Sequence, residues 1–253
     1  MKVIRIINFL GLLFMLLMNF LANALPLNGI TTGQISNAIP ALFTPAGYVF
    51  SIWGIIFLGM IGFGLYQLLP SQKENQRIQA MGYWFAVSSL LNGIWIVFWH
   101  YGQIALSVLV MLGLLFSLIM VYTRSRIGLE HPPLRERWLL DIPFGIYLGW
   151  ISVATIANIS ALGVVGGWGS NGTAEFWTVL MIGVAGVLAV AMMWRRNDIA
   201  YPMVVAWALI GIYVARQDYP MIASTAAVTA VVIFVFLLIL LAGLLAKDET
   251  PYN

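Results

Sequence analysis

The sequence predicts an all-α protein, a membrane bundle of about eight transmembrane helices. Hydrophobic residues make up 62% of the 253-residue chain and charged residues only 8%, against roughly 25% charged residues in soluble domains. The mean hydropathy is +0.95. The apolar residues are gathered in long runs with short polar breaks, and each run is near the roughly 20 residues that a helix needs to cross a bilayer.

We expect one helix for each of eight apolar runs. They span approximately residues 6–26, 47–69, 81–101, 103–123, 138–163, 174–194, 199–215 and 219–246. The first five runs form the first predicted unit, residues 1–163. Residues 164–253 contain the other three helices. Neither end of the chain carries a soluble domain, and no internal repeat is visible.

The basic residues predict the orientation of the bundle. Of the twelve Lys and Arg residues, eleven fall on one side of the predicted helices and only Arg216 falls on the other. Because cytoplasmic loops carry the excess of Lys and Arg, we expect both termini in the cytoplasm. The net charge of +3 reflects this loop placement and does not indicate a nucleic-acid partner. Cys is absent, which excludes disulfides and thiolate chemistry.

The first run has two interpretations. Lys2 and Arg5, the apolar run and Ala22-Asn23-Ala24 are similar to a signal peptide with an A-x-A cleavage site. Cleavage would leave seven helices and an external amino terminus. We favour a retained helix, because the run is at the long end for a signal peptide.

The longest external connection, residues 27–46, contains no charged residue. Pro40, Pro45, Gly29 and Gly33 interrupt any long helix there. An uncharged and partly apolar loop can pack over a helical bundle as a lid. A loose surface loop is equally compatible with this composition.

The fifth run, residues 138–163, has two different faces. Gly145, Gly149 and Ser152 follow at i, i+4 and i+7, a small-residue pattern that lets another helix come close. The opposite face carries Trp150 and Asn158. An Asn in hydrocarbon needs a hydrogen-bond partner, which can be another helix, water or a ligand. We therefore interpret this helix as one wall of a site.

Two further runs place aromatic rings on one face. Asn92, Trp95 and Trp99 share a face of the third helix, and Trp53 and Phe57 share a face of the second. Facing one another, these helices would enclose an apolar cavity with a few polar points, as small-molecule sites do. The alternative is that the rings fill the core and each Asn bonds a neighbouring helix.

Few ionisable residues lie inside the runs. Asp141 is about one turn into the fifth helix, where an ion pair with Arg135 or Arg137 at the membrane interface is expected. His100, without a second His or a nearby acid, is a poor metal ligand. No nucleophile–base arrangement or phosphate-binding loop is present, so we predict no catalytic residues, no metal site and no resident cofactor.

Three motifs resemble the TspO/translocator-protein family, the tryptophan-rich sensory proteins also known as peripheral-type benzodiazepine receptor homologues. They are Phe43-Thr44-Pro45 followed by Tyr48-Val49-Phe50 and Trp53; Asn92 and Trp95 followed by Trp99; and Trp150, Ser152, Ala154, Thr155 and Asn158. Their order agrees with the family's five-helix core over roughly residues 6–163. Tyr48 departs from the family's usual Trp, and three more helices follow. The chain therefore resembles an extended, divergent branch.

The resemblance implies a five-helix bundle with a lidded cavity that binds a flat hydrophobic molecule, a porphyrin or other tetrapyrrole, for sensing or carriage. Carried over by position, the implied ligand-binding residues are Tyr48, Trp53, Asn92, Trp95, Trp99, Trp150 and Asn158. The last three helices would cover the bundle or form an interface between copies. Two alternative functions remain, a secondary transporter of a small hydrophobic solute and a light-dependent porphyrin-degrading enzyme. The expected location is a bacterial inner membrane, with the lipid bilayer as a partner.

Overall fold

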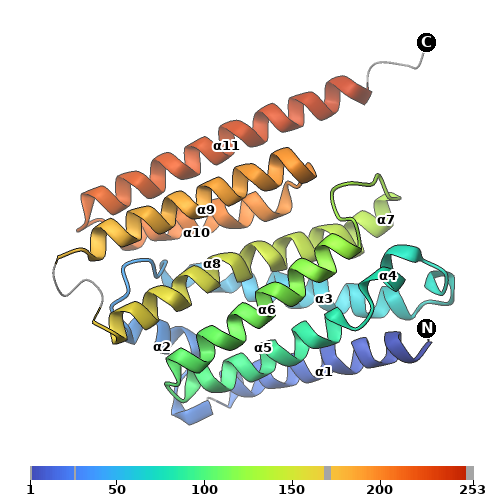
Figure 1. The fold of residues 1–253 in the computed structure, drawn as a ribbon, viewed down its shortest axis with the longest axis horizontal. Coiled ribbons are helices and arrows are strands. Elements are labelled where there is room, and N and C mark those ends of the chain that lie inside the picture. The colour runs from blue at the N-terminus through green and yellow to red at the C-terminus, as the bar shows by residue number, and fades with distance from the viewer. Residues whose placement is uncertain (1, 26, 168–171, 249–253) are drawn as a thin grey trace.

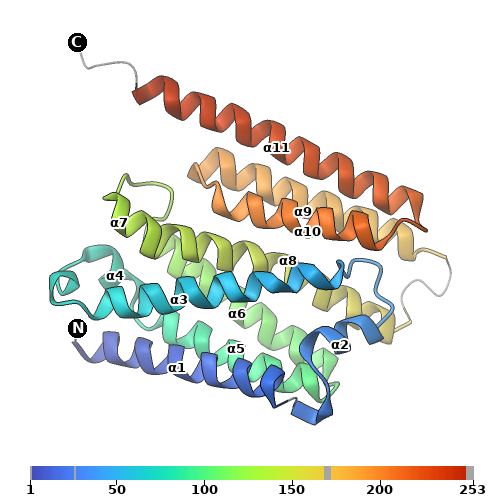
Figure 2. The same cartoon turned by 180° about the vertical axis from the view of Figure 1, so that it is seen from behind.

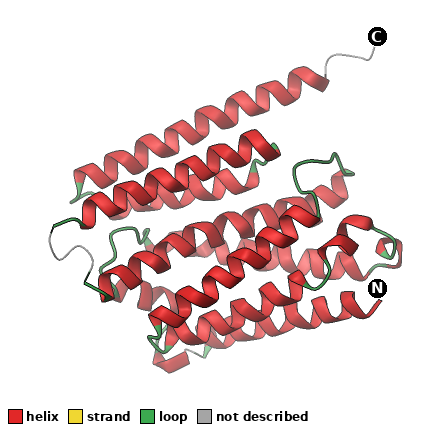
Figure 3. Ribbon diagram, in the orientation of Figure 1, coloured by secondary structure: helices red, strands yellow, loops and turns green. Residues whose placement is uncertain are grey.

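The computed structural model describes residues 2–25, 27–167 and 172–248, and these residues form helices and connecting turns without any strand (Figure 1; Figure 3). The predicted all-α fold class is confirmed. The long helices are α1 (Lys2–Ala24), α3 (Ile52–Leu68), α5 (Trp84–His100), α6 (Ile104–Arg124), α8 (Ile142–Val165), α9 (Ala174–Arg196), α10 (Ala200–Ala215) and α11 (Pro220–Asp248). The short elements are η1 (Leu27–Gly29), α2 (Thr32–Ala38), η2 (Gly47–Ser51), η3 (Pro70–Gln72), α4 (Gln76–Met81), α7 (Leu134–Glu136) and the π-helical turn η4 (Arg137–Asp141).

One of the long helices corresponds to each of the eight predicted apolar runs, with ends that differ by a few residues. Within the described chain, six helical stretches are long and apolar enough to cross a membrane, namely those of α1, α3, α6, α8, α9 and α11. The other two, α5 and α10, are apolar but only 17 and 16 residues long. The preceding turn η2 extends α3, and α7 and η4 together extend α8, so that the stretch ending in α8 has 32 residues.

Helix α8 lies in the middle of the molecule (Figure 1; Figure 2). On one side it packs against α3 and α6, and α1 and α5 complete this group. On its other side α10 packs against it, and α9 and α11 pack against α10. The described chain begins and ends at the same end of the bundle, where α4 and α7 also lie, and α2 lies at the opposite end (Figure 1).

The contact between α8 and α10 depends on the small residues predicted for it. A methyl group on Gly149 would lie 2.9 Å from the carbonyl oxygen of Tyr201 and 3.2 Å from its Cα atom. A methyl group on Gly145 would lie 3.0 Å from the Cβ atom of Ala200. Backbone atoms cannot move aside as a flexible side chain can, so only glycine at position 149 allows the helices to come this close.

Helix α10 begins at a buried carboxyl group. The backbone N–H groups of Ala200 and Tyr201 donate to Oδ1 of Asp198 at 2.7 and 3.1 Å, and the Tyr122 hydroxyl donates to Oδ2 at 2.6 Å. These bonds satisfy N–H groups that have no partner inside the helix. Burial raises the pKa of Asp198 above its ordinary value, because a carboxylate is costly to remove from water.

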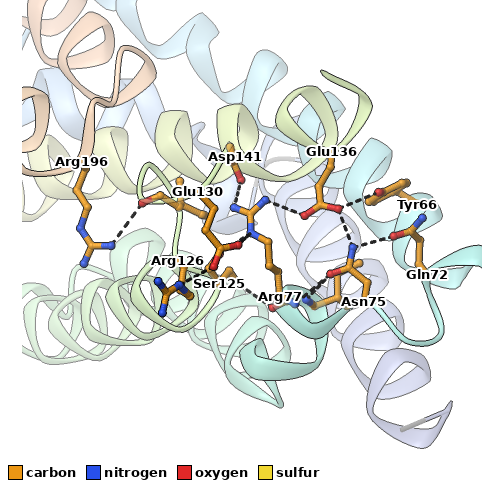
Figure 4. A network of polar contacts seen from close by, with 12 residues as sticks. Tyr66, Gln72, Asn75, Arg77, Ser125, Arg126, Glu130, Glu136, Asp141 and Arg196 are labelled. Carbon is orange, nitrogen blue, oxygen red and sulfur yellow. Dashed lines mark hydrogen bonds and ion pairs between the residues drawn. The ribbon is translucent and has the colours of Figure 1, made fainter. Parts of the chain in front are cut away.

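A buried arginine joins the connections at the end of the bundle where α4 and α7 lie (Figure 4). Arg77 donates from Nη1 to Glu136 at 2.7 Å, and its Nη2 is ion-paired with Asp141. Its Nε donates to the Ser125 carbonyl at 2.8 Å. The ion pair predicted for Asp141 is therefore present, but the expected partner was wrong. Arg77 is far from Asp141 in sequence, and only the turn into α4 brings them together.

We expect Gly149→Ala to destabilise the fold by about 1–3 kcal/mol, because the added methyl group would force the backbones of α8 and α10 apart. Thermal unfolding in detergent would measure the change. Gly54→Ala is the matched control, since a methyl group on Gly54 meets nothing within 4 Å. Equal melting temperatures for the two variants would contradict the close contact.

Asp198 should also make stability depend on pH. A raised pKa means that the folded state holds the proton more tightly than the unfolded state. The associated stability is complete below the ordinary pKa of 3.8 and is lost as the pH rises through the raised value. Asp198→Asn cannot ionise, so the melting temperature of the wild type relative to this variant should fall as the pH rises from about 4 through the raised pKa of Asp198. A constant difference between the two proteins would contradict this assignment.

Candidate functional site

A narrow cavity lies between α3, α5 and α8, beneath the segment that connects α1 to α3. The space between its atoms amounts to about 590 Å³, part of it open to solvent, but the centre of a water molecule can move through only about 50 Å³. The cavity is therefore a crevice rather than a chamber. Its lining residues are Thr32, Ser36, Ile39, Thr44, Pro45, Phe50, Trp53, Trp95, Trp99, Trp150, Val153, Ala154, Ala157, Asn158 and Ala161.

Four tryptophans form most of the aromatic surface of the cavity. Trp95 and Trp99 are stacked on α5, with ring centroids 5.9 Å apart and planes inclined by 21°. Trp53 on α3 meets Trp150 on α8 edge to face, with centroids 6.1 Å apart. Phe50 meets Trp150 in the same way at 5.8 Å. Rings packed against one another keep their orientation, so the walls of the crevice are flat and fixed.

Asn158 fixes one of these rings through a hydrogen bond. The Trp95 indole N–H donates to Oδ1 of Asn158 at 2.9 Å, and Nδ2 of Asn158 donates to the Ser107 hydroxyl at 2.9 Å. This chain of bonds links α5, α6 and α8 at the depth of the cavity. The amide of Asn158, predicted to lie on this face of α8, therefore finds its hydrogen-bond partners on the neighbouring helices α5 and α6.

The other two buried indole N–H groups of the cavity have no partner. Trp99 is 5% exposed and Trp150 is 2% exposed, and neither Nε1 atom has a hydrogen-bond partner in the structure. A buried donor without an acceptor costs stability. Both residues line the crevice, where a ligand carrying an acceptor, or an ordered water, can remove that cost.

The first half of the connecting segment is attached to the end of α5 by His100. The Leu27 carbonyl accepts a hydrogen bond from Nδ1 of His100 at 3.0 Å, and Nε2 lies 2.9 Å from the Thr32 hydroxyl. The Asn28 side chain donates to the carbonyl of His100 at 3.1 Å. Residues 27–32 are therefore fixed over the bundle, so the lid interpretation of this loop fits the structure and the loose-loop alternative does not.

Five of the seven residues predicted to bind a ligand line the cavity together, namely Trp53, Trp95, Trp99, Trp150 and Asn158. Tyr48 and Asn92 lie elsewhere. Tyr48 is 44% exposed and meets the edge of Trp207 on α10, with centroids 5.2 Å apart. Asn92 accepts a hydrogen bond from Asn19 at 2.7 Å and donates to the Tyr147 hydroxyl at 3.0 Å, inside the contact of α1, α5 and α8.

The lid contributes polar residues to the cavity that were not predicted from the sequence. Thr32 and Ser36 come from the short helix α2, which begins with a capping box formed by Thr31 and Gln34. A Thr followed three residues later by Gln is a helix-start signal that could have revealed this helix. None of the lining side chains is ionisable. Among the described residues, no group of three or more His, Asp or Glu could hold a metal ion.

A family model described as TSPO-like protein matches residues 5–239. The chain belongs to the TSPO-like family. The resemblance inferred from the three tryptophan-containing motifs is thereby confirmed. No curated protein and no solved structure matches the chain significantly.

Membership of the TSPO-like family extends over all eight long helices. The match does not end at residue 163 but continues through α9 and α10 and into α11. The division into residues 1–163 and residues 164–253 therefore stays a prediction, as does the binding role of each lining residue. The match and the apolar helices together establish an integral membrane protein of the TSPO type.

Replacing Asn158 should loosen the cavity wall. Asn158→Ala removes the acceptor of the Trp95 indole N–H, and leaving that buried donor unsatisfied should cost about 1–3 kcal/mol of stability. Thermal unfolding would measure the loss, with Asn37→Ala on the exposed side of α2 as the control. A variant as stable as the wild type would show that the bond between Trp95 and Asn158 contributes nothing.

Proposed function

We propose that the protein binds a flat, hydrophobic small molecule in this cavity and acts as a membrane sensor or carrier for it. A tetrapyrrole such as protoporphyrin is the first ligand to test, because the resemblance to the family implies that class. The two unpartnered indole N–H groups carry the proposal. They are buried donors inside an aromatic crevice, and a ligand with an acceptor would satisfy them.

The shape of the cavity favours a flat ligand. Pockets for drug-sized molecules have about 300–1,000 Å³, more than the about 50 Å³ open to the centre of a water molecule here, but a crevice lined by stacked and edge-on rings suits a thin aromatic molecule. A molecule as large as a porphyrin therefore requires part of the lid to move away from the walls. Residues 41–46 are the part that can move, since they lie outside any helix, whereas residues 27–32 are fixed to α5 by His100.

A secondary transporter is the second candidate, and it has less support. Coupling to protons needs a titratable group within the membrane, and Asp141 is the residue that the sequence offers. In the structure Asp141 is ion-paired with Arg77 and does not line the cavity. A porphyrin-degrading enzyme is supported by the family analogy alone. The cavity offers Thr, Ser and Asn side chains and indole groups but no acid–base pair.

We propose further that both termini lie in the cytoplasm, in a bacterial inner membrane. Arg77 on α4 and Arg135 on α7 lie at the end of the bundle where the described chain begins and ends, whereas Arg216 lies beside the lid at the other end. This distribution is the one that the positive-inside rule requires.

Tryptophan-fluorescence quenching by protoporphyrin tests the binding proposal. We expect saturable quenching of the purified protein, and dissociation constants about 2–10 times larger for Trp99→Phe and Trp150→Phe. Each change keeps an aromatic ring but removes one N–H donor, and a single hydrogen bond accounts for about that factor. Trp95→Ala, which removes a whole wall, should have the largest effect without preventing membrane insertion.

The control is Trp194→Phe, because Trp194 is 82% exposed and does not line the cavity. Its dissociation constant should equal that of the wild type. Quenching that rises linearly with protoporphyrin, or that is the same in all variants, would contradict a tetrapyrrole site. Ligand flux across proteoliposomes would then test the transporter alternative.

A further inference from the structure

The segment over the cavity is attached to the bundle at two places, one on α5 and one at the end of α10. Residues 27–32 are fixed to α5 by His100, as described above. Residues 41–46 form the second part, and Thr44 and Pro45 within it line the cavity. This 41–46 segment takes its attachment from α10, a helix that does not itself line the cavity.

Arg216, directly after α10, binds the 41–46 segment through its guanidinium group. Nε donates to the Leu42 carbonyl at 2.8 Å, and Nη2 donates to the carbonyls of Ala41 and Thr44, each at 3.0 Å. These carbonyls lie outside any helix; the Ala41 carbonyl also accepts the Thr44 N–H at 3.1 Å, whereas the Leu42 and Thr44 carbonyls take their donor from Arg216. The planar, five-donor guanidinium group can serve several carbonyls at once, which a lysine ammonium cannot do with the same geometry.

Two further hydrogen bonds attach α10 to this segment and to η2, which follows it. The Ala46 N–H donates to the Gly211 carbonyl at 3.1 Å, and the Trp207 indole donates to the Val49 carbonyl at 3.2 Å. A methyl group on Gly211 would lie 2.2 Å from a Val49 methyl carbon and 3.1 Å from the Cβ atom of Pro45. A larger residue at position 211 would therefore push the segment away from α10.

We propose that the end of α10 is a clasp for the cavity. Arg216 and Gly211 hold the 41–46 segment in its closed position, and a ligand enters or leaves when this attachment opens. Arg216 is a positioning residue, since it acts on Thr44 and Pro45 and does not touch the cavity. The part of the proposal that concerns ligand exchange rests on the binding function proposed above, and the opening of the cavity can be measured without any ligand.

The first test measures opening directly. The natural chain has no Cys, so Ala161→Cys places a single thiol on the cavity wall at a residue that is 3% exposed. We expect a maleimide to label this thiol about ten times faster when Arg216→Gln is added, because hydrogen bonds to a charged group are the strong kind. Arg216→Lys should give an intermediate rate. Arg195→Gln, at the exposed end of α9, should leave the rate unchanged.

The second test uses protoporphyrin in stopped-flow quenching. The clasp should close the empty cavity and the ligand-bound cavity equally. Weakening it by Arg216→Gln should therefore raise the association and dissociation rates by a similar factor. The dissociation constant would then change by less than about twofold. A residue that only maintained the fold would instead weaken equilibrium binding. That result, or wild-type labelling of Ala161→Cys in the Arg216→Gln background, would overturn the clasp.

A disulfide provides a test that does not depend on losing an interaction. A Cβ atom on Gly211 would lie 3.4 Å from the Cβ atom of Val49, close to the spacing that a disulfide needs. In Val49→Cys/Gly211→Cys the oxidised protein should exchange protoporphyrin more slowly in stopped-flow quenching than the same protein after reduction. Equal rates in both redox states would overturn the clasp.

The two proposals can fail separately. Faster labelling of the Arg216→Gln variant in a protein that does not bind protoporphyrin would leave the clasp standing and remove the tetrapyrrole function. Saturable binding with unchanged rates in both the Arg216→Gln and the disulfide variants would leave the binding function and remove the clasp.

Discussion

The close contact of α8 with α10 at Gly149 is the constraint on which the rest of the structure depends. One face of α8 carries Trp150 and Asn158 into the cavity, and the other has no side chain at the point where the Tyr201 backbone passes. Because α10 is fixed at this contact, its far end reaches the segment over the cavity. The distance between α8 and α10 therefore sets the positions of the cavity wall on α8, of α10 itself and of the lid.

Hydrogen bonding separates the residues that build the bundle from those that face the cavity. Asn92 and Asn158 both lie deep in apolar helices, and both find partners on neighbouring helices. In a membrane interior such bonds are needed, since water is not there to replace them. The indole nitrogens of Trp99 and Trp150 have no such partner, and neither do the buried side chains of Gln67 and Ser89. What distinguishes the two indole groups is that they line the cavity, where a ligand can reach them, whereas Gln67 and Ser89 do not.

Patterns within single helices predicted the structure well. They did not predict the contacts between segments that are distant in the sequence. Helical spacing identified the rings of α3, α5 and α8, which do face one cavity, and the small-residue edge of α8. Tyr48 does not line the cavity, because its ring packs against that of Trp207, 159 residues later. Asn92 does not line the cavity either, because its side-chain oxygen accepts a hydrogen bond from Asn19 on α1. Neither contact follows from a periodic pattern in the sequence. The ion pair between Arg77 and Asp141 does not follow from one either.

The shortness of α10 has a consequence for where the clasp lies in the bilayer. Its 16 residues rise about 24 Å, less than the roughly 30 Å of a typical hydrocarbon layer. The neighbouring α9 and α11, with 23 and 29 residues, exceed that thickness. Hydrophobic mismatch therefore acts unequally across this group of helices, and thicker membranes draw Arg216 and the carbonyls it binds toward the apolar layer. Lipid chain length thus becomes a physical variable at the lid of the cavity.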